Sequence, residues 1–400
     1  MKNITLVSII LLGLLIFVSC GNDFKSKKIN MMAKYNIDIK DPSGKENEQS
    51  NRIGDYIDSC FYVKLQTGKN NYMGQIKKIL IANDTIFIKD KNSKSIFIYT
   101  MEGKLIKKIN DEGRGPNEYS SITDFTIDWT HNKLKIYDDR MRKQISYNYE
   151  GNFLSINKVK NYARNISYVG GEKFAFYNNY NGLVGDDNHN LRISDQSEKN
   201  IDRYFPYDKK LTSKTVRGKW DYFWTSNEVD VNMVKYYDNN IYRLEGSTIY
   251  PKYHFDFGQF NLPQDIILNS LNSGSNYVHS LSNLFESKNT LTVNYLFKNS
   301  NILLFYNKNT SNMVFPRSRN WVNETNFNQL FFPNYVLGCY KDYFIVAIPS
   351  DLIPSFIDRQ EKILAPKDSN YFTNLEHVKD LKNINSMDNP VLFFYKMKDF

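Results

Sequence analysis

A repeat of about forty-eight residues constrains the fold more than any other feature of this sequence. Residues 99–103 (YTMEG) and 147–151 (YNYEG) share a Tyr and a Glu-Gly step, and they are 48 residues apart without a gap. A third copy at residues 242–246 (YRLEG) follows 95 residues later, close to two further periods. A period of this length is typical of a β-propeller in which each repeat is one blade.

Four short strands are predicted within each of the two clearest repeats. They are apolar or alternating runs separated by Asn, Asp, Gly and Ser, which favour turns. In the first repeat they cover residues 76–81, 85–90, 95–99 and 104–109, and in the second residues 123–128, 133–138, 144–148 and 153–159. The Glu-Gly steps then fall in the hairpin between the third and fourth strands, where glycine supplies a positive φ.

Later repeats are indicated by apolar runs that end in Tyr, at residues 303–306 and 391–395, each after a longer insertion. Counting every register predicts an all-β fold, a six-bladed β-propeller with four-stranded blades, over residues 52–400. The aromatic content of 15 % also favours strands. The early strand at residues 59–65 and the last strand have no other partner, so we expect them to pair and close the ring.

Small helical inserts are predicted in the late blades, at residues 263–271 and 374–383. Their sequences lack the alternation of the predicted strands. We expect them to lie in connections and to leave the four-stranded pattern intact.

The first twenty residues predict export. Lys2 precedes an apolar run at residues 4–18, which has the length of a signal peptide and is too short for a convincing membrane span. Ser19 and Gly21 flank Cys20 with small side chains, as in a relaxed lipobox with Phe17 at the usual Leu position. We therefore expect a lipoprotein signal peptide at residues 1–20, lipidation of Cys20 and attachment to the membrane through this lipid anchor. The alternative is an uncleaved anchor or a buried strand.

Residues 21–51 are predicted to be a flexible tether, because they are rich in Lys, Asn and Ser and have little apolar content. No later segment approaches eighteen uninterrupted apolar residues, so the rest of the chain is expected outside the cytoplasm without crossing the membrane. Beyond Cys20 the cysteines are Cys60 and Cys339. The sequence is compatible with a disulfide between them and equally with two free thiols.

The formal net charge of +9 comes from lysines that are scattered along the chain and form no stripe. This pattern indicates a solvated basic surface and no nucleic-acid partner. An anionic glycan or lipopolysaccharide partner stays open.

Three motifs give the chain a family resemblance. Residues 113–119 (GRGPNEY) match the pattern Gly-x-Gly-Pro-x-Glu-Tyr, residues 253–258 (YHFDFG) are followed by Leu262-Pro263, and residues 389–392 (NPVL) lie near the end. Over residues 53–398 the chain resembles the six-bladed, NHL-like β-propeller lipoproteins of Bacteroides and relatives, although it departs from them in the polar insert at residues 178–190. The resemblance implies a propeller and a cell-envelope location. It carries no established reaction, so catalytic residues stay unknown.

Residues 113–119 also hold the candidate ligand-binding residues, Arg114, Glu118 and Tyr119. The loop joins the outer strand of one blade to the inner strand of the next, so it is expected on a face that borders the central channel. Arg114 offers a bidentate donor for carboxylate, phosphate or sugar oxygens, and Tyr119 could stack on a sugar ring. The structural alternative is that Glu118 caps backbone amides and Tyr119 packs between blades.

No cofactor is expected. Asp124 and Asp128 flank an inner strand and could help to hold calcium, but no Asp-x-Asp-x-Asp-Gly loop supports this. The five histidines, at positions 131, 189, 254, 279 and 377, have no zinc-ligand spacing. No Gly-x-Ser-x-Gly elbow is present either.

These features predict a non-enzymatic binding or scaffold protein of the cell envelope, at the outer membrane, with the periplasmic side slightly favoured over the surface. Its partner on one face of the ring would be a glycan, a peptide or another envelope protein. The alternative is a hydrolase or lyase that acts on a saccharide or lactone at the channel mouth. A carboxylate cluster or a bound cation there favours the enzyme, and an aromatic rim, such as residues 220–224 (WDYFW), favours binding.

Overall fold

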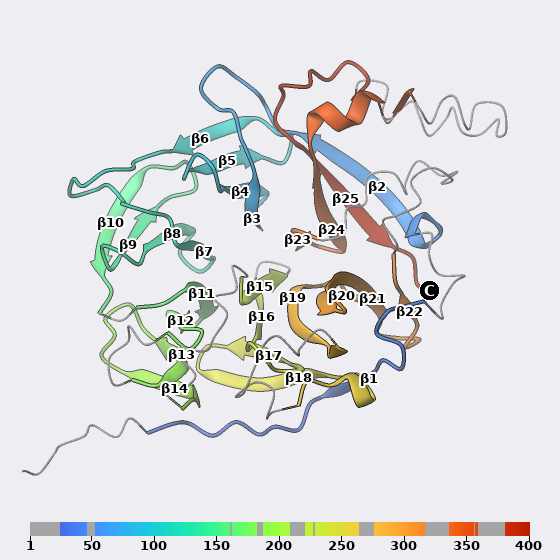
Figure 1. Ribbon diagram of the computed structural model, residues 1–400. Helices are drawn as coiled ribbons and strands as arrows, with labels where there is room; N and C mark the ends of the chain where they lie inside the picture. Colours follow the sequence, from blue (N-terminus) through green and yellow to red (C-terminus); the bar gives the residue numbers. More distant parts are fainter. Residues whose placement is uncertain are drawn as a thin grey trace, which may run out of the picture.

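The computed structural model describes residues 25–45, 53–160, 162–181, 187–208, 221–226, 229–263, 276–316, 336–355, 357–358 and 381–400. These residues form sheets that stand side by side around a central axis, with the first strand of each run innermost (Figure 1). The observed architecture is that of a β-propeller.

Four separate sheets have four strands each. The first contains β3 (Ile76–Ala82), β4 (Thr85–Asp90), β5 (Ile96–Thr100) and β6 (Leu105–Ile109). The second contains β7 (Asp124–Asp128), β8 (Lys133–Asp138), β9 (Lys143–Tyr147) and β10 (Phe153–Lys158). The third contains β11 (Asn165–Gly170), β12 (Lys173–Tyr177), β13 (His189–Ser194) and β14 (Ile201–Pro206). The fourth contains β19 (His279–Glu286), β20 (Thr290–Phe297), β21 (Ser300–Asn307) and β22 (Met313–Val314).

The remaining strands share one nine-stranded sheet, in the order β1-β18-β17-β16-β15-β23-β24-β25-β2. One half contains β1 (Tyr35–Asp38), β15 (Phe223–Ser226), β16 (Asp230–Val234), β17 (Asn240–Glu245) and β18 (Thr248–Asp256). The other contains β2 (Ile57–Lys64), β23 (Gly338–Tyr340), β24 (Tyr343–Ile348) and β25 (Val391–Met397). A single parallel pair between Ser226 and Cys339 joins the halves.

The all-β propeller with four-stranded blades is confirmed, but six separate blades are not observed. Four blades are separate, because the inner strands β15 and β23 pair and merge the other strands into one sheet. Ring closure is confirmed, since β2 pairs antiparallel with β25 along its whole length. The predicted helical inserts lie outside the described residues, apart from Pro263 and residues 381–383.

The repeat motif explains how neighbouring blades contact each other. Its tyrosines, Tyr99, Tyr147 and Tyr242, are fully buried between sheets. Gly103 has a φ of +80°, and a Cβ there would lie 2.0 Å from the carbonyl oxygen of Lys64 on β2. Glycine therefore allows this hairpin to touch the preceding outer strand.

The chain before β2 follows the outer rim of the ring (Figure 1). Within it β1 pairs parallel with β18 over four residue pairs, from Tyr35–Tyr253 to Asp38–Asp256. This part of the predicted tether is therefore an edge strand of the propeller. Across the described ranges, no helix is long and apolar enough to span a membrane.

Cys60 and Cys339 form no disulfide with each other. Cys60 on β2 and Cys339 on β23 are free thiols, and β24 and β25 lie between their strands. Burial raises the pKa of the Cys60 thiol to about 12 and also raises that of Cys339. Both thiols are therefore neutral at physiological pH.

Candidate functional site: the polar mouth of the channel

Charged side chains gather where the inner strands begin. The inner strands run in the same sense, so their first residues meet at one mouth of the central channel. We call this group the polar mouth. It consists of Lys77, Lys78, Lys89, Asp124, Asn165 and Asp221.

Asp124, at the start of β7, is the most buried member, with a side chain that is 1 % exposed. Its Oδ1 accepts hydrogen bonds from Lys78 Nζ (2.8 Å) and the Phe125 amide (2.8 Å). Its Oδ2 accepts from the Ile166 amide (3.0 Å) and Asn165 Nδ2 (3.1 Å). Burial raises the pKa of this carboxyl, but the Lys78 and Lys89 ammoniums and the hydrogen bonds outweigh it, so the net pKa is lowered.

A second pair spans the channel. Lys77 Nζ, on β3, lies 3.7 Å from Asp221 Oδ2, just before β15 on the opposite side of the ring. Asp221 Oδ1 accepts a hydrogen bond of 3.3 Å from the same Asn165 amide group that contacts Asp124. The side chains of Lys77 and Asp221 are 34 % and 22 % exposed, so they form the accessible part of the polar mouth.

Lys89, on β4, also belongs to the polar mouth. Its ammonium donates a hydrogen bond of 2.7 Å to the Thr123 carbonyl oxygen. Burial lowers the pKa of Lys89, and the carboxylates of Asp124 and Asp221 offset only part of that effect. With three lysines and two aspartates, the polar mouth carries a small excess of positive charge.

Apolar side chains fill the channel below the polar mouth. The cavity directly beneath has a volume of about 30 Å³ and is lined by Ile79, Leu80, Phe223, Phe285 and Leu337, together with mouth residues. Deeper in, a second cavity of about 10 Å³ lies between residues such as Ile127, Trp129 and Ile345. Both volumes are far below that of a cavity that holds a six-membered ring, so neither cavity admits a sugar ring.

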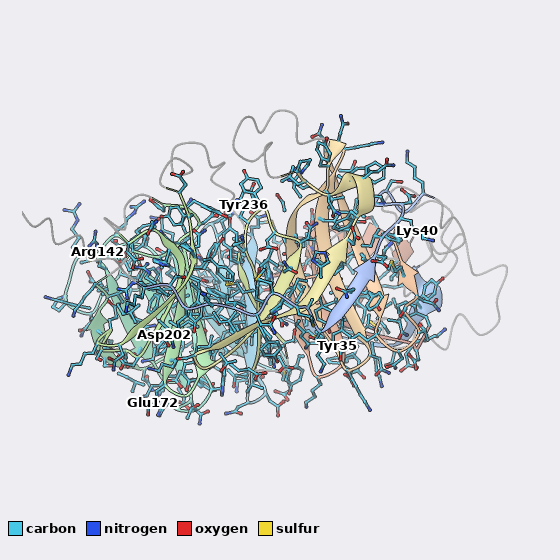
Figure 2. All side chains as sticks on the ribbon, turned by 90° about the horizontal axis from the view of Figure 1, so that it is seen from below. Tyr35, Lys40, Arg142, Glu172, Asp202 and Tyr236 are labelled. Carbon is cyan, nitrogen blue, oxygen red and sulfur yellow. The ribbon has the colours of Figure 1, made fainter. Side chains whose placement is uncertain are left out.

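Packed tyrosines border the polar mouth on the side of the third and nine-stranded sheets. Tyr222 follows Asp221 directly, and its ring lies 4.6 Å from Tyr177, measured between centroids. Tyr236 and Tyr237 have ring centroids 4.1 Å apart, and Tyr236 lies towards one face of the ring (Figure 2). The buried hydroxyl of Tyr222 has no hydrogen-bond partner among the described residues. Buried hydroxyls normally have one, so this group can still donate a hydrogen bond.

Two of the three candidate residues predicted from the sequence have structural roles. Glu118 folds back to accept a hydrogen bond of 2.7 Å from the Gly115 amide. Tyr119 is buried, and its hydroxyl donates to the carbonyl oxygens of Lys94 (3.0 Å) and Ile109 (3.3 Å). These contacts agree with the structural alternative. Arg114 is exposed and stays accessible.

The structure does not bring together Asp124 and Asp128, the two aspartates considered for a cation. These residues occupy opposite ends of β7, about 13 Å apart at the usual strand rise. Asp128 instead contacts His131 Nδ1 at 3.0 Å. In the described ranges no group of three or more His, Cys, Asp or Glu side chains could hold a metal ion.

The aromatic run at residues 220–224 supplies packing rather than an exposed rim. Tyr222, Phe223 and Trp224 are buried, and Trp220 lies outside the described residues. Sequence reasoning identified Asp124 but missed the lysines and Asp221. Lys77, Lys78 and Asp221 had a positional signal, because they are polar residues at or near the starts of inner strands, where the blade pattern otherwise calls for apolar side chains. Lys89 lies on β4, paired with Lys78.

Comparisons with known proteins agree with this fold. The family described as "Domain of unknown function (DUF4934)" matches residues 34–396. The structure is similar to that of a candidate exported protein from Bacteroides fragilis, with 18 % sequence identity, a TM-score of 0.71, and coverage of 91 % of this chain and 99 % of that chain. A DUF4221 member from Bacteroides vulgatus matches with 9 % identity, a TM-score of 0.47, and coverage of 86 % and 97 %. The sequence matches no curated protein.

Proposed function

The chain belongs to the DUF4934 family, a domain family of unknown function, and on that premise we propose that it is a binding or scaffold protein of the cell envelope. Its partner binds at the polar mouth. We count the nine-stranded sheet as two blades, β15–β18 and β23, β24, β25 and β2, whose inner strands have paired. Six blades then form a rigid ring that holds the site in place.

The observation that supports this proposal is a group of charged side chains, held by hydrogen bonds, above a channel that apolar side chains fill. Lys77 is the most exposed charged residue of the two ion pairs at the mouth, so an approaching ligand meets an ammonium first. A carboxylate on an acidic glycan or an acidic peptide could displace Asp221 from Lys77 at little electrostatic cost.

The polar mouth supports binding better than hydrolysis. A glycosidase needs one carboxyl group with a raised pKa as its general acid. Here the pKa of Asp124 is lowered, and its oxygens already accept four hydrogen bonds. The cavities beneath are also too small for a substrate ring.

The envelope location rests on the predicted signal peptide at residues 1–20 and on the predicted lipidation of Cys20, both outside the described residues. The similar fold of a candidate exported Bacteroides protein supports it. The outer membrane, facing the periplasm, is the proposed site of attachment.

The test is a thermal-shift screen of residues 21–400 with oligogalacturonate, a poly-glutamate peptide and neutral maltohexaose. An acidic probe should raise Tm, because a ligand at 100 times its Kd stabilises the folded state by about 2.7 kcal/mol. The shift should disappear in Lys77→Glu and persist in Lys288→Glu, an exposed residue in the β19–β20 hairpin on the opposite face. Equal shifts in both variants, or a shift with maltohexaose alone, would refute binding of an acidic ligand at the polar mouth.

A further inference from the structure

Residues 25–45 form a strap that is fastened to the rim of the propeller. At its start, the Lys27 amide donates to the Arg203 carbonyl oxygen at 2.8 Å, and the Lys27 ammonium lies 2.7 Å from Asp202. Both partners belong to β14. The first contact point of the strap is therefore the outer strand of the third sheet.

Two further contacts fix the rest of the strap. In the middle, β1 pairs with β18, Tyr35 stacks on Tyr253 at 5.3 Å between ring centroids, and Ile37 is buried. Towards the end, the carbonyl oxygen of Pro42 accepts a hydrogen bond of 2.8 Å from the Tyr295 hydroxyl on β20. The strap thus crosses three neighbouring sheets, and Figure 1 shows it along one side of the ring.

This docking shortens the connection between Cys20 and the folded domain. If residues 21–51 were all flexible, the domain could lie up to about 110 Å from the lipid anchor. Because Lys27 is already fastened to β14 and the described strap begins at residue 25, about five residues remain, which span at most about 17 Å. The rim at β14 must then stay close to the bilayer.

The exposed surface of the strap has the chemistry of a membrane interface. Met31 and Met32 are 55 % and 82 % exposed. The lysines that surround them are also exposed and lie at positions 25, 28, 34 and 40. Apolar side chains interspersed with lysines bind the headgroup region of bilayers that contain anionic lipid.

We propose that the strap is the membrane-facing edge of the protein, so that the ring stands edge-on with β14 and β18 nearest the lipid. This orientation rests on the lipid anchor at Cys20 in the proposed function. Figure 2 looks onto the rim that carries the strap, with Tyr236 towards one face of the ring and Glu172 towards the other. Both faces, and with them the polar mouth, then open sideways and stay accessible to a partner.

The test uses the full-length lipidated protein on vesicles of phosphatidylethanolamine and phosphatidylglycerol at 3:1, in a Cys60→Ser background. An environment-sensitive fluorophore is attached at Met32→Cys or, as the matched control, at Met387→Cys. Met387 is 70 % exposed and lies across the ring, close to Asn389, which contacts the Met73 amide before β3. Lipid-borne quencher should reduce the fluorescence at position 32 several-fold more than at position 387.

The outcomes separate the orientation from the anchor. Protein that floats with the vesicles but is quenched equally at both positions, or more at 387, would overturn the edge-on orientation and leave the anchor intact. Protein that does not float would overturn the anchor and the orientation with it.

The variant Lys25→Glu/Lys28→Glu/Lys34→Glu should still float but lose most of the quenching at position 32. Unchanged quenching would show that the lysines do not face anionic lipid.

Discussion

The ion pair between Lys78 and Asp124 gives a quantitative test of how the polar mouth is held together. Replacing Asp124 by Ala removes the acceptor for four hydrogen bonds. It also leaves the Lys78 ammonium, whose side chain is only 11 % exposed, without its carboxylate. Lys78 keeps a hydrogen bond of 2.8 Å to the Phe125 carbonyl oxygen, so its ammonium loses the carboxylate but still has one acceptor.

The expected loss follows from these contacts. Breaking a buried ion pair by removing one partner destabilises a protein by about 3 to 5 kcal/mol, because a buried charge loses its counterion. Lys78→Met should destabilise less, by about 2 kcal/mol, since the three other donors still stabilise Asp124. The double variant removes both members of the Lys78–Asp124 pair, so it should be less destabilised than the sum of the single variants by at least about 2 kcal/mol.

The assay is guanidinium unfolding of residues 21–400 for the four proteins of this double-mutant cycle, followed by circular dichroism and tyrosine fluorescence. Losses that add to within about 0.5 kcal/mol would refute the reasoning, because independent sites add to that precision. A loss below about 1 kcal/mol for Asp124→Ala alone would show that the carboxylate is solvated and that the polar mouth is not preorganised.

Three further predictions concern the scaffold. Gly103→Ala should lower the free energy of unfolding by at least about 2 kcal/mol more than Gly246→Ala. Both positions have positive φ, but only at Gly103 would the added Cβ clash with backbone. Equal melting temperatures of the two variants would contradict this. Cys60 and Cys339 should react with iodoacetamide at pH 8 more than ten times slower in the native than in the unfolded protein, because burial raises the pKa of both thiols. Labelling of Cys60 in the native protein at the rate of the unfolded protein would contradict this prediction. Asp124 and Glu286 have lowered pKa values because neighbouring lysines, which at Glu286 are Lys252 and Lys308, outweigh burial, so their stabilisation should be complete above about pH 5 and lost as pH falls through the folded pKa. Asp124→Ala should accordingly show a shallower acid limb in a pH series of unfolding midpoints than the unaltered protein.

The sequence was most informative where the repeat is strictest. In the first two blades the predicted strands agree with β3 to β10 to within one residue at every end, because turn residues and apolar runs alternate there without insertions. Ring closure by β2 and β25 was also predictable, since each strand lacked any other partner. The pairing of Ser226 with Cys339 was not, because it joins inner strands that are distant in the chain and carry no local signal.

The strap shows where composition misleads. Residues 21–51 have the polar composition of a tether, yet the short alternation from Tyr35 to Ile39 places Ile37 and Ile39 in the core. Four residue pairs on β18 provide the partner that makes this alternation a strand. Pairing with β18 therefore makes residues 35–38 a strand despite their polar surroundings, as tertiary contacts do for short strands in general.

The candidate site was predictable only in part. The loop from Gly113 to Tyr119 does connect two blades, but its Glu118 and Tyr119 stabilise the loop itself. Lys77 and Lys78 share β3, whereas Asp221 precedes β15 in another sheet, and only the ring brings them together. Charged residues that are distant in the sequence can therefore converge at one mouth of a propeller.

Hydrogen–deuterium exchange with and without the acidic probe that gives the largest thermal shift tests the central claim most directly. If the partner binds at the polar mouth, exchange should slow in the peptides that contain residues 76–78 and 221–226, and it should stay unchanged in the β19–β20 hairpin at residues 287–289. Protection confined to that hairpin or to an outer strand such as β10, with none at the starts of β3 and β15, would contradict the account.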